Sequence, residues 1–282
     1  MGHDPQVTRV HTYHADASVL GGRIERPFDQ VIPVQAPLTL PPVGGYAKAH
    51  TESFRLDGIV SVKFGHTQVA GSMSPTGSFS TLTTSVLEGL NVLDIFTADR
   101  MVAQISLTHP RVGYYPRVTL VGTQYENVRI GGQPVVIDLD LNICKQCDSK
   151  SFPSQPCIRD SDFLARVAEQ RQRMMDEDSI PEWATEQSVP NWVRERYAWG
   201  DLKTESGRDS VLCSVVKEIR GEFPGSVFGN VFDIPDFGKG FLGELLVDNG
   251  SYQLSLLRLE LGCTIKGAGS FGIVKGNGST NP

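Results

Sequence analysis

The 282-residue sequence contains no long apolar run, few cysteines and no excess of basic residues. No stretch reaches the roughly 20 apolar residues that a membrane-spanning helix needs. The first residues show no basic segment followed by an apolar one, so no secretory signal is visible. We therefore expect no transmembrane segment and a cytoplasmic location by default, unless a leader has been removed.

The charge balance is also one-sided, but toward acid. The formal net charge is −6 at pH 7, with 26 Lys and Arg against 32 Asp and Glu. A nucleic-acid surface needs clustered Lys and Arg to displace counterions, and electrostatic docking on an anionic membrane needs them as well. The sequence predicts no nucleic-acid partner.

Five cysteines are an odd and small number, which does not suggest a disulfide framework. Cys144, Cys147 and Cys157 lie in one polar, loop-like segment. Structural zinc takes four ligands, so a Zn²⁺ site here also needs a histidine, Cys213 or Cys263. A loop disulfide and free thiols are the alternatives.

The usual catalytic signatures are missing. There is no HExxH, no EF-hand spacing and no GxSxG. Two strings resemble protein-kinase motifs, a glycine-rich loop at 267–274 and Asp-Phe-Gly at 236–238. Their order is the reverse of that in kinases, and no lysine strand or catalytic loop accompanies them. We interpret both as ordinary β segments.

What the sequence does contain is a strong strand pattern. In residues 137–143, apolar side chains alternate with Asp138, Asp140 and Asn142, which predicts one strand with an apolar face and a polar face. Three oxygen-bearing side chains on one face could hold Ca²⁺, with further oxygens from a neighbouring loop. The alternative is a solvated strand face, and no cofactor is the default expectation.

A second pattern predicts a hairpin. Two apolar runs, 241–247 and 252–261, flank Asn249-Gly250, and Asn-Gly favours a two-residue turn with positive φ. This turn fixes which residues lie opposite each other: Val247 and Tyr252, Leu245 and Leu254, Phe241 and Arg258, and Lys239 and Glu260, the last as an ion pair.

Short strands with tight turns recur before residue 145 and after residue 207, whereas 65–78 is rich in Gly, Ser and Thr and is expected to be a hairpin loop. Between the two β regions, helices are expected from Asp160 or Ser161 and at 190–199. The predicted fold is therefore mainly β, an antiparallel sandwich or open barrel with a helical insert at about 160–200. We expect one domain over 1–282; the alternative is a β domain at 1–150 and an α+β domain at 151–282.

The insert holds all three tryptophans. Trp183, Trp192, Tyr197 and Trp199 are candidate ligand-binding residues, because exposed aromatic side chains mark recognition surfaces. The alternative is that these rings pack the insert against the sheet.

Two classes of function remain. The first is a non-enzymatic binding or self-assembly module, in which the arm at 27–45, with its five prolines, reaches a neighbouring subunit and forms a homo-oligomer. The second is a β-scaffold hydrolase of a polysaccharide, which needs two carboxylates across a groove. Asp236, Glu244 and Glu260 are its candidate catalytic residues.

Overall fold

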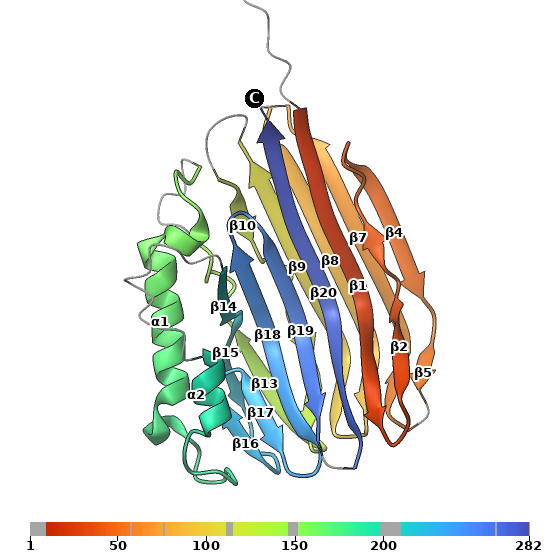
Figure 1. Cartoon of the computed structure of the whole chain (residues 1–282), viewed down its shortest axis with the longest axis vertical. Coiled ribbons are helices and arrows are strands. Elements are labelled where there is room, and N and C mark those ends of the chain that lie inside the picture. The colour runs from red at the N-terminus through yellow and green to blue at the C-terminus, as the bar shows by residue number, and fades with distance from the viewer. Residues whose placement is uncertain are drawn as a thin grey trace, which may run out of the picture.

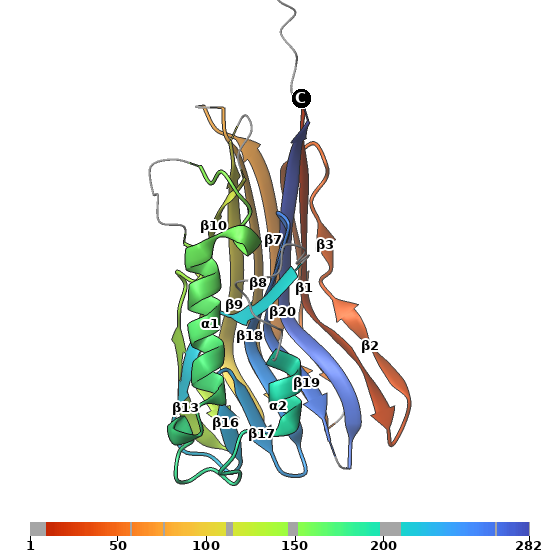
Figure 2. The same cartoon turned by 60° about the vertical axis from the view of Figure 1, so that its left-hand side comes forward.

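The computed structural model describes residues 10–56, 58–75, 77–110, 115–145, 152–197, 210–262 and 264–281. Long antiparallel strands form two sheets that pack face to face, with the helices at one side (Figure 1). Figure 2 shows the two layers from the side. The predicted mainly β sandwich with a helical insert is confirmed.

The first sheet has nine strands in the described part of the chain, and its main path runs β16-β17-β18-β19-β20-β1-β2. β14 also pairs with β18, and β3 with β1. The strands are β1 Val10–Arg26, β2 Gln30–Gln35, β3 Leu38–Thr39, β14 Ser210–Ser214, β16 Ser226–Phe228, β17 Val231–Ile234, β18 Gly238–Asp248, β19 Tyr252–Leu261 and β20 Lys266–Asn281.

The second sheet has eleven strands among the same residues. β8 and β9 form its long central pair, β4 and β7 extend it on one side, and β12, β13 and β15 extend it on the other. Its strands are β4 Gly45–Thr51, β5 Phe54–Leu56, β6 Val60–Val62, β7 Phe64–Met73, β8 Phe79–Val92, β9 Phe96–His109, β10 Arg117–Thr119, β11 Gln124–Glu126, β12 Val128–Ile130, β13 Gln133–Leu139 and β15 Val216–Arg220.

The insert contains two α-helices, α1 Ser161–Met175 and α2 Asn191–Tyr197, with short 3-10 turns at Cys157–Arg159 and Glu177–Ser179. Asp160 caps α1 as expected, because its side chain accepts a hydrogen bond from the Phe163 backbone nitrogen at 2.8 Å. Phe163 and Val167 bury this helix against the main core. Neither helix has the length and apolar character that crossing a bilayer requires.

One segment connects the two sheets. β14 pairs with β18 in the first sheet, and β15 pairs with β13 in the second. Val215 lies between them: its nitrogen donates to the Gly243 carbonyl at 2.9 Å, and its carbonyl accepts from the Asp140 nitrogen at 2.7 Å. The segment from β14 to β15 is therefore two short strands in different sheets, joined at one residue.

A row of backbone irregularities crosses the sheets. Gly243, Gly272 and Gly89 adopt positive φ of 60°, 62° and 64°, and the strand pairing skips each of them. On either side of Gly243, Leu242 and Leu245 both point into the main core, although strict alternation would point only one of them inward. After each such kink, the alternation of inward-facing and outward-facing residues along the strand is therefore shifted by one position.

The core fills the space between the two sheets. One cluster of buried side chains contains residues from before 145, from α1 and from after 210. Tyr125 ties the sheets together across it, because its hydroxyl donates to the Leu256 carbonyl at 2.7 Å. Leu256 is a residue that the β18–β19 ladder skips, so Tyr125 satisfies a carbonyl at the kink.

The expectation of a loop at 65–78 is wrong, since β7 occupies most of it and pairs with both β4 and β8. Its small residues lie where large neighbours approach: Gly65 faces Val19, and Gly71 faces Tyr13. Thr67 is fully buried and donates to the Ala36 carbonyl at 2.8 Å. A strand can use glycine and threonine in this way when the opposite sheet supplies the bulk.

Candidate functional site

The helical insert covers part of the outer face of the first sheet, over β16, β17 and β18 (Figure 1). A second, smaller apolar cluster forms there, with Trp192 packed at its border. Its buried members are Met174, Val189, Val193, Tyr197, Phe228, Val231 and Phe241.

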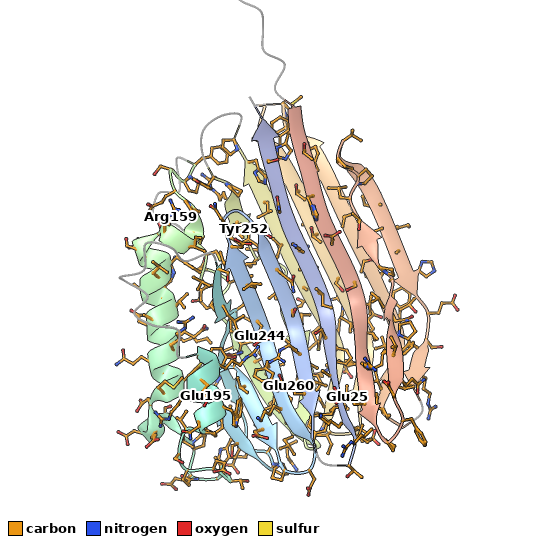
Figure 3. All side chains as sticks on the ribbon, in the orientation of Figure 1. Glu25, Arg159, Glu195, Glu244, Tyr252 and Glu260 are labelled. Carbon is orange, nitrogen blue, oxygen red and sulfur yellow. The ribbon has the colours of Figure 1, made fainter. Side chains whose placement is uncertain are left out.

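Glu244 lies beside this cluster, on the outer face of β18 (Figure 3). Its side chain is only 7% exposed. Oε1 accepts from Arg196 Nη2 at 2.5 Å and from Arg196 Nε at 3.2 Å, and Oε2 accepts from Arg258 Nε at 2.8 Å. The Tyr197 hydroxyl donates to Oε1 at 3.4 Å. Two guanidinium groups therefore compensate one buried carboxylate.

Phe241 completes the arrangement. It lies directly opposite Arg258 in the β18–β19 ladder, as the hairpin pattern predicts. The guanidinium carbons of Arg258 and Arg196 lie 3.8 and 4.5 Å from its ring centroid, a cation–π geometry that is stronger away from water. We call Arg196, Tyr197, Phe241, Glu244 and Arg258 the Glu244 cluster.

Glu260 lies next to the cluster but is 45% exposed, and it accepts a hydrogen bond from Arg258 Nη1. Lys239 is paired with Glu260 in the predicted register, yet its ammonium lies 3.9 Å from the Trp192 ring centroid. The predicted register is therefore confirmed, whereas the predicted Lys239–Glu260 ion pair is replaced by these two contacts.

The structure thus brings four predicted site residues together, Trp192, Tyr197, Glu244 and Glu260. It does not bring the others to them. Trp183 is half-buried against Phe223, with ring centroids 4.9 Å apart. Asp236 lies in the turn between β17 and β18 at a φ of 64°. Trp199 lies outside the described residues.

Sequence reasoning missed Arg196 and Arg258 as the partners of Glu244. Part of the signal for Arg258 was present, because the hairpin register places it opposite Phe241 and two residues from Glu260, on one strand face. Nothing in the sequence pattern indicated Arg196, since it reaches Glu244 only through the docking of α2.

The expected single strand face with Asp138, Asp140 and Asn142 is wrong, because β13 ends at Leu139. Asp138 forms an ion pair with Arg220 at 2.6 Å. Asp140 is held at the crossover by Val215, and its side chain accepts from the Asn142 backbone nitrogen at 3.0 Å in a local turn. Among the described residues, no group of three or more His, Cys, Asp or Glu side chains could hold a metal ion.

Cys144, Cys157 and Cys213 are buried free thiols. A hydrogen bond with Cys144, together with burial, raises the pKa of the Cys157 thiol. Cys213 donates to the Leu245 carbonyl at 3.5 Å, and burial raises its pKa. Thiols of this kind are unreactive and pack as small apolar groups. Cys147 lies outside the described residues, and so does Cys263.

A different kind of surface lies on the side away from α1, where β2 and β4 are the edges of the two sheets (Figure 1). The predicted arm at 27–45 is extended there and pairs with β1 of its own chain. Its inward residues Ile32, Ala36 and Leu40 are buried. We call the exposed residues the apolar edge surface: Phe28 (76% exposed), Val31 (64%), Val34 (54%), Val43 (89%) and Tyr46 (61%).

These features define a class of protein, a two-sheet antiparallel β-sandwich whose helical insert docks on one sheet through a buried charge cluster. The chain belongs to the family described as Domain of unknown function (DUF8256), whose model matches residues 11–248. The match ends with β18, so β19 and β20, which lie between β18 and β1, are outside it. No curated protein and no solved structure matches the chain.

Proposed function

We propose that this chain is a non-enzymatic self-assembly module whose contacts involve the apolar edge surface. The observation that carries this proposal is the distribution of exposed large apolar side chains. Of the ten in the described part of the chain, five lie within residues 28–46. Single exposed apolar residues are normal, but a concentration of them on one side marks an interaction surface.

The Glu244 cluster supports the non-enzymatic part of the proposal. A glycosidase carboxyl group must donate a proton to its substrate or attack it. Both oxygens of Glu244 accept hydrogen bonds from arginines, and the side chain is almost fully buried. Such a carboxylate stabilises the docking of α2 and has no free oxygen directed at a substrate.

Sedimentation velocity over a range of protein concentrations tests this function. The triple variant Phe28→Ser/Val31→Ser/Val43→Ser should raise the Kd of self-association by at least about 100-fold, because each buried Val or Phe contributes roughly 1.5–3 kcal/mol. The matched control is Val121→Ser/Val136→Ser, which changes two comparably exposed valines outside this segment. A wild-type chain that stays monomeric at the highest concentration would overturn the proposal, and so would equal effects of the two variants.

A further inference from the structure

β4 is an unprotected edge strand. It pairs with β7 from Gly45 opposite Gly71 to Thr51 opposite Gly65, and no other described strand pairs with its outer side. Natural edges are usually blocked by proline, by bulges or by very short strands, and the β2 edge contains Pro33. Residues 45–56 contain no proline.

The edge continues beyond β4. Thr51 of β4 lies opposite Gly65 of β7, and Phe54 of β5 lies opposite Val62 of β6. Both strands advance by three residues between these pairs, so β5 continues the register of β4. Glu52 therefore lies on the same outer path as β4. A strand added from outside would find a nearly continuous row of backbone groups along it.

The side chains of this edge alternate. Ala47, Ala49 and Thr51 are half-buried, whereas Lys48, His50 and Glu52 are exposed. Lys48 and Glu52 lie two residues on either side of His50, with opposite charges. Neither makes an ion pair with another described residue.

We propose that β4 pairs antiparallel with β4 of a second copy of this chain, with the two-fold axis at His50. This register places Lys48 of each copy opposite Glu52 of the other, so that two opposite-charge pairs form. The small residues Ala49 and Thr51 then face each other on the other side of the strands. The two eleven-stranded sheets become one continuous sheet across the axis.

Neighbouring registers lack this complementarity. An axis at Lys48 places the two lysines opposite each other, which is destabilising. An axis at Ala49 places Lys48 opposite His50 and Tyr46 opposite Glu52, with no pair of opposite charges. Because Tyr46 belongs to both the strand and the apolar edge surface, the inference rests on the proposed self-assembly and specifies its geometry.

Charge reversal with mixing tests the pairing. Lys48→Glu places two carboxylates opposite each other at both positions, and Glu52→Lys places two ammonium groups opposite each other. By sedimentation velocity of the full chain at low salt, each variant alone should raise the dimer Kd by about 10- to 100-fold. An equimolar mixture of the two should restore dimerisation, because in the mixed dimer the two carboxylates of one copy lie opposite the two ammonium groups of the other.

The double variant Lys48→Glu/Glu52→Lys tests the register itself. It exchanges the two charges within each chain, so that both cross-strand pairs are again of opposite charge, and its dimer Kd should return to within about 3-fold of the wild-type value. Lys217→Glu, an exposed reversal on β15, is the matched control and should leave the Kd unchanged.

The outcomes separate the inference from the function on which it rests. If both single reversals leave the Kd unchanged while the triple variant of the apolar edge surface raises it, the chain self-assembles but not through β4, and the inference is overturned. If the double variant is as weak as the single variants, the Lys48–Glu52 register is wrong and the inference is also overturned. A monomeric wild type overturns both.

Discussion

Gln170 and Ser214 exchange two hydrogen bonds at the place where the chain crosses from one sheet to the other. The Ser214 nitrogen donates to Gln170 Oε1 at 2.9 Å, and Gln170 Nε2 donates to the Ser214 carbonyl at 2.8 Å. Nε2 also lies 3.3 Å from the Val216 carbonyl. The buried side-chain amide of Gln170 on α1 thus supplies hydrogen-bond partners for backbone groups of Ser214 and Val216, at the point where the chain leaves one sheet for the other.

Gln170→Leu should therefore lower the free energy of unfolding by about 2–4 kcal/mol, because it leaves backbone groups of Ser214 buried without partners. Urea denaturation followed by circular dichroism measures the change. Gln172→Leu, on the exposed face of the same helix, should change it by less than about 0.5 kcal/mol. Similar losses for the two variants would contradict the role assigned to Gln170.

Tyr125→Phe should lower the free energy of unfolding by about 1–3 kcal/mol. The substitution keeps the ring but removes the hydroxyl that donates to Leu256, so this buried carbonyl loses its partner at the kink. Tyr46→Phe, which removes an exposed hydroxyl, is the control in the same denaturation experiment. A neutral Tyr125→Phe would show that the contact between the sheets at this point is dispensable.

Acid should destabilise the protein through His109. Burial, together with the nearby His11, lowers the pKa of His109 to about 4, compared with about 6.5 in an unfolded chain. Between these two pH values the unfolded state binds more protons than the folded state. The free energy of unfolding is therefore unaffected by this group above pH 6.5 and falls by about 3 kcal/mol as the pH drops to 4. Burial lowers the pKa of His11 as well, which adds to the effect in the same direction.

Unfolding free energies measured from pH 7.5 to pH 4 would reveal this slope. His109→Phe should flatten it, whatever its effect on stability at pH 7.5. An unchanged slope in His109→Phe would assign the acid sensitivity to other groups.

Glu244→Ala should lower the free energy of unfolding by about 3 kcal/mol or more, because it leaves the guanidinium groups of Arg196 and Arg258 without their shared carboxylate. Glu260→Ala should lower it by less than about 1 kcal/mol, since Glu260 is 45% exposed and its ion pair is screened by water. Equal effects of the two substitutions would show that burial does not distinguish these carboxylates.

The sequence predicted the β18–β19 register correctly because one local feature determines it. Asn249-Gly250 forms a two-residue turn, and from there Val247 lies opposite Tyr252 and Lys239 opposite Glu260. The contacts of Lys239 with Trp192 and of Arg196 with Glu244 were not predictable in the same way. They depend on α2, which lies more than forty residues away in the sequence and has no local pattern that indicates where it docks.

Strands rich in glycine were predicted least well. Residues 65–78 were predicted to be a hairpin loop, although β7 occupies most of this segment. Pattern recognition assumes that core positions carry large apolar side chains. In this sandwich, several core positions are glycine or threonine, and the bulk comes from the opposite sheet, as Val19 does for Gly65.

The kink at Gly89 has a consequence for insertions and deletions. Leu87 and Leu90 both point into the core because the irregular residue between them shifts the alternation. Straightening the strand at Gly89 without changing its length would turn Leu90 and Val92 outward, whereas deleting Gly89 would keep both inward but shift their pairing with β9 by one residue. Because the neighbouring strands have their own kinks, a change in the length of one strand here cannot be absorbed locally, and the strands can change length without refolding only at their ends.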